Sequence, residues 1–80
     1  MLNRRVVCAY LYVITKYGYP PAAGDTRKYL EEMKALGFQS VELEGIREEH
    51  LGEMYDMRHD VAGWADELGL SIPIFCVVLP

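Results

Sequence analysis

Residues 36–45 read Leu-Gly-Phe-Gln-Ser-Val-Glu-Leu-Glu-Gly. A similar stretch begins 32 positions later, where residues 68–79 read Leu-Gly-Leu-Ser-Ile-Pro-Ile-Phe-Cys-Val-Val-Leu. Each stretch opens with a Leu-Gly pair, in which the glycine suits the left-handed end of a helix. Each then continues into a run typical of a β-strand. One strand–helix unit of an eight-stranded (β/α)8 barrel takes roughly 31 residues. The repeat therefore predicts successive units of a parallel α/β fold.

The predicted elements alternate along the whole chain. We expect helices over about 26–36 and 48–68, and strands over about 6–13, 38–44 and 71–79. Asp25 is a suitable N-cap for the first helix. Gly52 and Gly63 weaken the second, whose first turns are candidates for a separate short helix. With right-handed crossovers, both helices cover one face of three parallel strands. The fold class is therefore α/β: residues 1–80 form a single partial domain, a parallel β-α-β-α-β piece from the N-terminal part of a (β/α)8 TIM barrel.

The first and third predicted strands are apolar on both faces, so the second face of the sheet needs a cover. An uncovered three-stranded sheet exposes several hundred Å² of apolar surface and an unpaired edge on each side. We favour the explanation that these residues begin a longer barrel. The alternative is that the chain self-associates or aggregates through the bare sheet. The sequence does not show whether Pro80 is the true C-terminus.

Composition excludes several classes of protein. The chain is 51% apolar, which argues against disorder, and its formal net charge is −4 without a Lys/Arg run, which argues against nucleic-acid binding. The apolar run from Val6 to Ile14 is too short to span a bilayer. Tyrosines within this run and the lack of a clear cleavage site argue against a secretory signal. We therefore expect a cytoplasmic protein with neither a membrane nor a nucleic-acid partner.

The two cysteines, Cys8 and Cys76, have no metal-site spacing and lie within apolar runs. We expect buried free thiols in a reducing compartment, with a single disulfide as the alternative.

The second predicted strand carries the strongest candidate site residues. Val41 and Leu43 alternate with Ser40, Glu42 and Glu44, so the two sets lie on opposite faces. If the helices cover Val41 and Leu43, the carboxylates point into the barrel interior near its C-terminal mouth, where this architecture builds active sites. Glu42 and Glu44 are therefore candidate substrate-binding residues. The alternative is a structural carboxylate paired with Lys or Arg, or a solvated one.

Two further residues are weaker candidates for substrate binding. Tyr12 shares a strand face with Tyr10 in this prediction and could hydrogen-bond a substrate hydroxyl, with simple packing as the alternative. His50 follows the second strand on the mouth side, with a helix-start or surface residue as the alternative. His59 is expected to be solvated. No phosphate-binding glycine motif, nucleophile motif or metal-ligand spacing is present, so we assign no catalytic or metal-binding residue.

Residues 36–43 resemble the "LGFDGVEL" signature of sugar-phosphate isomerases and epimerases in the xylose-isomerase-like TIM-barrel superfamily. Residues 67–70, Glu-Leu-Gly-Leu, resemble the "ELGL" lead into that family's third strand. The resemblance covers nearly the whole chain but only the first three of eight strands. Gln39 and Ser40 depart from the usual Asp-Gly, which leaves the subfamily open.

The resemblance implies a metal-dependent enzyme of carbohydrate metabolism. Family members interconvert aldoses and ketoses, or invert a carbon next to a carbonyl, with a divalent metal such as Mn, Mg or Zn. Their metal ligands lie on later strands, so none maps onto this sequence; only Glu42 matches a motif position, near the substrate. The resemblance therefore implies that this piece is inactive alone. Two alternatives stay open: a free-standing structural or regulatory α/β protein that self-associates, and a fragment of an endonuclease-IV-like barrel.

Overall fold

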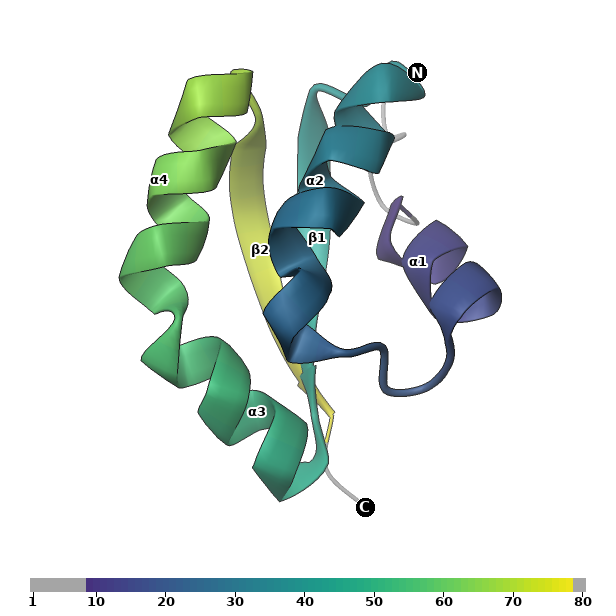
Figure 1. Ribbon diagram of the computed structural model, residues 1–80, viewed down its shortest axis with the longest axis vertical. Coiled ribbons are helices and arrows are strands. Elements are labelled where there is room, and N and C mark those ends of the chain that lie inside the picture. Colours follow the sequence, from purple (N-terminus) through teal and green to yellow (C-terminus); the bar gives the residue numbers. More distant parts are fainter. Residues whose placement is uncertain (1–8, 79–80) are drawn as a thin grey trace.

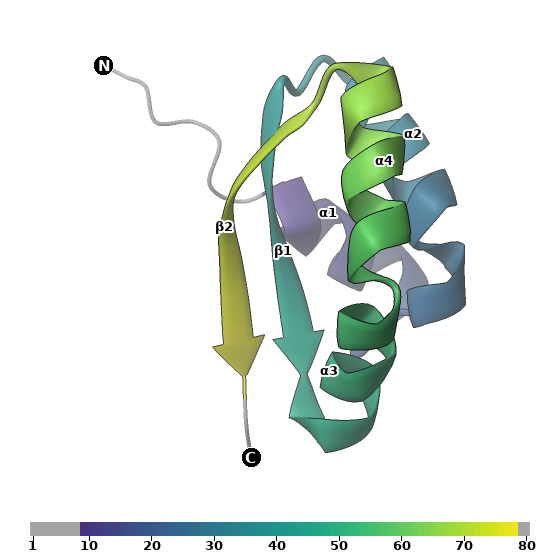
Figure 2. The same ribbon diagram turned by 90° about the vertical axis from the view of Figure 1, so that its left-hand side faces the viewer.

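The computed structural model describes residues 9–78 and has two layers, a parallel sheet and a layer of helices on one face of it (Figure 1). Along the described chain the elements are α1 (Ala9–Tyr17), the 3-10 turn η2 (Ala23–Asp25), α2 (Thr26–Ala35), β1 (Ser40–Ile46), α3 (Arg47–Asp56), α4 (Arg58–Leu68) and β2 (Ser71–Val78). Figure 2 shows α2, α3 and α4 on the same side of β1 and β2. The described residues therefore form a small α/β domain with four α-helices and a two-stranded parallel sheet.

The two Leu-Gly pairs lie at the C-terminal ends of α2 and α4, and both ends have the same backbone conformation and hydrogen bond. Gly37 has φ 102° after α2, and Gly69 has φ 71° after α4. The residue after each glycine donates a hydrogen bond to a carbonyl of the last helical turn: Phe38 N–H to Met33 O at 3.1 Å, and Leu70 N–H to Ala65 O at 2.8 Å. In both places the chain reverses and enters a parallel strand. The predicted helix–strand units are therefore confirmed for this part of the chain.

The predicted long helix consists of two helices, as its weak first turns suggested. α3 and α4 meet at Met57. The Met57 N–H donates to Glu53 O, and the Val61 N–H donates to Met57 O, so helical hydrogen bonds continue across the junction. Met54 and Val61 of the predicted apolar stripe are buried, and the other three members, Met57, Trp64 and Leu68, pack against the core. The stripe was therefore predicted correctly.

Asp25 stands at the N-cap of α2, but its side chain makes no capping hydrogen bond. The preceding 3-10 turn gives Asp25 φ −98° and ψ 13°, instead of the extended conformation from which a cap side chain reaches back to the helix. Thr26 instead donates its hydroxyl to Ala23 O at 2.7 Å.

The strand predicted over 6–13 is wrong from residue 9 onward, because Ala9–Tyr17 is helical; residues 6–8 lie outside the described chain. Tyr10 and Val13 are fully buried, and Ile14 and Tyr17 pack against the core. These four residues follow the i, i+3, i+4, i+7 spacing of a helix face. The described chain thus has two parallel strands in place of the predicted three, and α1 lies along β1 on the side away from β2 (Figure 1).

The two strands change register at the only proline in β2. Ser40 stands opposite Ser71, but Glu42 stands opposite Ile74, so β2 has one extra residue between these pairs. Pro73 lies within that step and has no N–H to donate to a ladder, which is why a bulge accommodates it.

The predicted alternation in β1 is confirmed. Val41 and Leu43 are buried, whereas Ser40, Glu42 and Glu44 are partly exposed. Since residues i and i+2 share a face, the carboxylates lie on the face of β1 opposite to Val41 and Leu43. Val41 and Leu43 join Leu30 and Met33 of α2 in the buried core between the sheet and the helices.

The step from β1 into α3 depends on the absence of a side chain at Gly45. A Cβ at this position would lie 3.2 Å from both Cα and Cβ of Leu51, so α3 itself would have to move. We expect Gly45→Ala to lower the free energy of unfolding by about 1–3 kcal/mol, as overpacking does.

Gly63, inside α4, is the matched control because a Cβ there meets nothing within 4 Å. Gly63→Ala should raise the free energy of unfolding by about 0.5–1 kcal/mol, since alanine restricts the unfolded chain and favours the helix. Urea unfolding of both variants tests the close approach, and an equal effect of the two substitutions would contradict it.

Candidate functional site

The carboxyl end of β1 forms a recess lined by polar and apolar residues. β1 passes into α3 without a connecting residue, and Arg47 makes the turn with φ 62°, a left-handed conformation that a non-glycine residue rarely adopts. A cavity of about 330 Å³ opens here. Its apolar lining residues are Pro20, Pro21, Ala22 and Ile46. Its polar and charged lining residues are Arg47, Glu49, His50 and Glu53. We call this cavity the His50 pocket.

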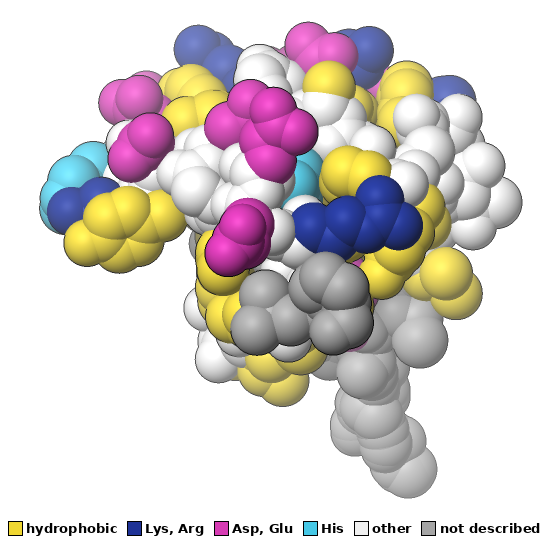
Figure 3. All heavy atoms as spheres, turned by 90° about the horizontal axis from the view of Figure 1, so that it is seen from below, with side chains coloured by type: hydrophobic (Ala, Val, Ile, Leu, Met, Phe, Trp, Pro, Cys, Tyr) yellow, Lys and Arg dark blue, Asp and Glu magenta, His cyan; other side chains and the backbone are white. Residues whose placement is uncertain are grey.

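Figure 3 looks onto this end of the molecule. A histidine side chain is visible between acidic, basic and hydrophobic side chains. The Arg47 guanidinium carbon lies 5.7 Å from the centroid of the Tyr19 ring, so the β1–α3 turn contacts the segment that precedes α2. The pocket thus joins parts of the chain that are distant in sequence.

His50 is the buried polar group of this pocket, with 3% of its surface exposed. Its Nδ1 accepts a hydrogen bond from the Ile46 backbone N–H at 2.9 Å. A neutral imidazole that accepts at Nδ1 carries its proton on Nε2. Within the described residues, Nε2 is buried and has no hydrogen-bond partner. Burial lowers the pKa of His50, and the nearby Glu53 carboxylate opposes this effect. His50 is therefore a neutral donor at pH 7. It lies near the start of α3, as the helix-start alternative has it, but it is buried and not a surface residue.

Glu42 and Glu44 lie together on the other face of β1. Burial raises the pKa of Glu44, and the charge of Glu42 raises it further. Burial also raises the pKa of Tyr10, with the Glu44 charge as the next cause. The Tyr10 hydroxyl is buried without a partner among the described residues. Glu44 thus has a carboxylate and a phenol in its electrostatic neighbourhood, and no ion pair with Lys or Arg is formed by either glutamate within residues 9–78.

Tyr12 does not join the other candidates. On a helix, Tyr10 and Tyr12 point in different directions, so the shared face predicted for them is wrong. The Tyr12 hydroxyl donates to Glu32 Oε1 at 2.9 Å, and Lys16 Nζ contacts the same oxygen at 3.2 Å. The Tyr17 hydroxyl donates to Glu32 Oε2. Tyr12 therefore links α1 to α2. We call Tyr12, Lys16, Tyr17 and Glu32 the Glu32 cluster.

Removing the charge of this cluster should loosen α1. Hydrogen bonds from Tyr17 and then Tyr12 lower the pKa of Glu32 below its usual 4.5. A carboxylate with a lowered folded-state pKa stabilises the fold above its unfolded pKa, and this contribution is lost as the pH falls through the folded value. We expect Glu32→Gln to speed amide hydrogen exchange in α1 at pH 7, with a smaller difference from the parent chain below about pH 4.

The matched control is Glu31→Gln on the same helix, because Glu31 is exposed and pairs only with the exposed Arg27 at 3.5 Å among the described residues. Equal exchange rates in α1 for both variants would show that the Glu32 cluster does not hold α1 in place.

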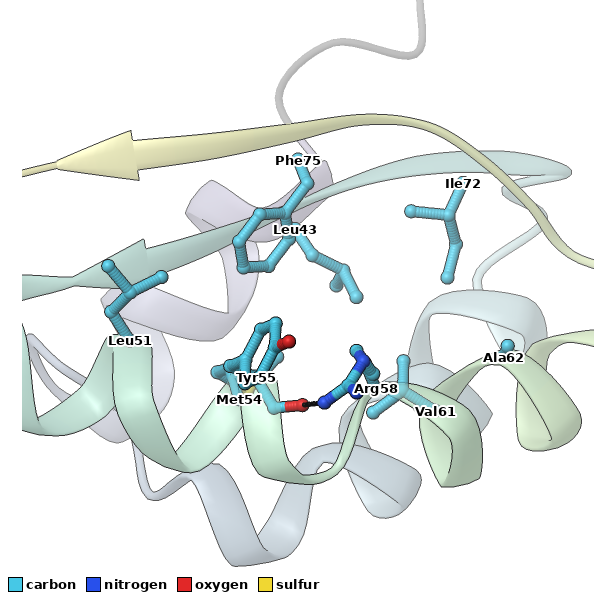
Figure 4. A pocket seen from close by; sticks show the side chains of 9 residues that line it. All are labelled: Leu43, Leu51, Met54, Tyr55, Arg58, Val61, Ala62, Ile72 and Phe75. Atoms are coloured by element: carbon cyan, nitrogen blue, oxygen red, sulfur yellow. Dashed lines mark hydrogen bonds between the residues drawn. The ribbon is translucent and has the colours of Figure 1, made fainter.

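A second cavity, which the sequence reasoning missed, lies between α3, α4 and β2 (Figure 4). Its volume is about 340 Å³, and its walls include Leu43, Met54, Val61, Ile72 and Phe75. Figure 4 shows Phe75 and Ile72 reaching from β2 toward Tyr55 and Arg58 on the helices. Arg58 donates to Tyr55 O at 2.9 Å and covers the Tyr55 ring, with 3.8 Å between guanidinium carbon and ring centroid. This apolar groove opens beside the outer strand of the sheet.

Three other sequence expectations concern cysteines, histidine and metals. Cys76 is partly buried, and Cys8 lies outside the described residues. His59 is exposed, as predicted. Between residues 9 and 78, no group of three His, Cys, Asp or Glu side chains is arranged to hold a metal ion. The residues at hand therefore do not supply a ligand set for the divalent metal that the family resemblance implies.

None of the three comparisons with known proteins found a match. They covered protein-family models, curated proteins and solved structures. In the described part of the chain, no helix has the length and apolar character needed to cross a membrane.

Proposed function

We propose that these 80 residues are the N-terminal part of a sugar or sugar-phosphate isomerase/epimerase of the xylose-isomerase-like type, and that this part is inactive alone. One observation carries the proposal. β1 and β2 are parallel neighbours joined through α3 and α4, and β1 presents Glu42 and Glu44 on its face away from Val41 and Leu43. In a (β/α)8 barrel that face is the interior, and the carboxyl ends of the strands form the active site.

Glu42 and Glu44 would serve as substrate-binding residues in that barrel. A carboxylate accepts hydrogen bonds from neighbouring hydroxyl groups, which is the main polar chemistry that a sugar offers. The raised pKa of Glu44 comes from burial and from Glu42, so a hydroxyl donor between the two carboxylates would relieve their repulsion. The proton transfer and the metal ligands would lie on residues outside this sequence.

The test is an activity assay on the native protein isolated from its source cells, with substitutions made in its gene. We expect interconversion of at least one aldose–ketose or epimer pair, followed by NMR of the sugar carbons. Glu42→Gln should lower kcat/KM by about tenfold or more, the size expected for a lost hydrogen bond to a charged group. Glu31→Gln is the control on the exposed side of α2. No interconversion of any pair in a broad aldose and ketose panel, or equal effects of both variants, would contradict the proposal.

A second candidate function is supported by the outer strand. Ile74, Phe75 and Val77 of β2 are 44–54% exposed, and no described strand pairs with the far edge of β2. A free-standing chain with this edge would complete its sheet by self-association and act as a structural or regulatory oligomer. The next unit of a barrel would cover the same edge.

A further inference from the structure

The apolar groove between α3, α4 and β2 has one charged residue in its walls, Arg58. Its helical wall follows the spacing of a single helix face, because the lining residues of α3 and α4 are Leu51, Met54, Tyr55, Arg58, Val61 and Ala62. The residues that line it from the two strands, Leu43, Ile72 and Phe75, are apolar. The groove therefore carries one positive charge in the middle of an otherwise uncharged surface.

The contacts of Arg58 orient its side chain but leave its charge unpaired. One guanidinium nitrogen donates to Tyr55 O at 2.9 Å, and the guanidinium carbon lies 3.8 Å from the centroid of the Tyr55 ring. Within residues 9–78, Arg58 forms no ion pair. It also lies in the first turn of α4, where the helix dipole disfavours a cation. An anion beside Arg58 would be stabilised by both effects.

The remaining surface of the groove suits a hydrocarbon chain. Tyr55 and Phe75 are 59% and 44% exposed, and Figure 4 shows Phe75 reaching from β2 toward Tyr55 and Arg58. The volume of about 340 Å³ is at the lower end of the range for small-molecule sites, which favours a chain of medium length. Burying such a chain removes apolar surface of both the chain and the groove from water.

Charge and apolar surface together select one class of ligand. An inorganic anion would leave the apolar walls in contact with water, and an uncharged hydrocarbon would leave Arg58 without a partner. A fatty-acid carboxylate satisfies both, because the planar guanidinium matches the two oxygens of a carboxylate and the acyl chain fills the groove.

We propose that the apolar groove binds a medium-chain fatty acid, with its carboxylate on Arg58 and its acyl chain between Phe75 of β2 and the faces of α3 and α4. This inference does not rest on the function proposed above, because binding is measured without any turnover.

The test is a calorimetric titration of the native protein with octanoate and with hexanoate. We expect octanoate to bind in a saturable manner, with about a fourfold loss of affinity for each of the two methylene groups that hexanoate lacks. Nuclear Overhauser contacts between the acyl chain and the Phe75 ring should place the ligand in the groove. Absence of saturable binding, or equal affinities for the two acids, would overturn the proposal. A groove filled by a second copy or by another part of the protein would give the first of these results.

The charge of Arg58 is tested separately with 1-octanol, which has the same chain length as octanoate but no charge. Arg58→Gln should weaken octanoate binding about fivefold, the size expected for an exposed ion pair, and leave 1-octanol binding unchanged. Arg58→Lys should keep most of the octanoate affinity.

Lys34→Gln is the matched control, because Lys34 is exposed on α2, does not line the groove and changes the net charge equally. Equal losses of octanoate affinity for Arg58→Gln and Lys34→Gln would mean that only the net charge acts, which would overturn the proposal. If Arg58→Gln fails to fold, the comparison of octanoate with hexanoate on the parent protein decides.

Discussion

Leu43→Ala is expected to lower the free energy of unfolding by about 2–5 kcal/mol, the usual cost of truncating a buried leucine. Leu43 is 2% exposed and lies on the helix-facing side of β1, across from Phe75 of β2. A domain of this length is stable by only about 4–12 kcal/mol in total. The single truncation should therefore remove a large fraction of the total stability and lower the midpoint of urea denaturation, followed by circular dichroism.

The neighbouring Glu44 provides the control, because it lies on the opposite face of the same strand. Its folded-state pKa is raised, so its ionisation opposes folding as the pH rises through that value. Glu44→Gln should therefore raise the stability at pH 7 and have little effect at pH 4, where the parent carboxyl is largely protonated. A large loss for Glu44→Gln together with a small loss for Leu43→Ala would mean that β1 has the reverse orientation, which a register slip of one residue would produce.

The isolated 80-residue chain is expected to self-associate, and two charges on β2 should prevent it. Ile74 is 51% exposed and Val77 is 54% exposed, and alternation places them on opposite faces of this outer strand. Lysines on an edge strand block edge-to-edge pairing, because the second chain would have to bury them. In sedimentation velocity, the parent should show concentration-dependent association, and Ile74→Lys with Val77→Lys should sediment as a monomer of about 9.1 kDa.

The matched control places the same two charges away from the edge. Leu11 on α1 and Leu36 after α2 are exposed apolar residues at 56% and 58%, so lysines there change the net charge to the same extent. Leu11→Lys with Leu36→Lys should leave association unchanged. A parent chain that stays monomeric over a wide concentration range would show that the exposed face of β2 needs no cover.

The sequence predicted the second half of the fold well because local signals agree there. Gly37 and Gly69 end helices in the conformation that glycine favours, and each is followed by a strand. The alternation of Val41 and Leu43 with glutamates fixed the faces of β1 in advance. The strand expected over 38–44 lies at Ser40–Ile46, and the helix expected over 48–68 begins at Arg47 and breaks at Met57. The break at Met57 and the bulge at Pro73 depend on packing and hydrogen bonding that periodicity does not report.

The first predicted strand failed because a continuous apolar run has no period. Residues 6–13 contain no polar residue that distinguishes a strand from a buried helix. The distinguishing signal came later in the chain, at the exposed Thr15 and Lys16 and the partly buried Tyr17, which extend a helical spacing begun at Tyr10. Tyr12 was misplaced for the same reason, since its direction depends on the type of element that carries it.

Two of the four candidate site residues could be placed correctly from the sequence. Glu42 and Glu44 could be placed on one face from alternation alone. The burial of His50 could not, because it depends on the close approach of α3 to β1 at Gly45 and on a hydrogen bond from Ile46 N–H. The apolar groove beside β2 likewise arises from tertiary packing, since its walls come from four elements, β1, α3, α4 and β2.

The most direct test of the central claim is the intact mass of the native protein isolated from its source cells. The claim is that these residues form the first part of a larger barrel enzyme, whose remaining units cover β2. A barrel of about 250 residues predicts a mass near 30 kDa. A native mass of 9.1 kDa would contradict the claim and would leave self-association as the way in which the exposed strand is covered.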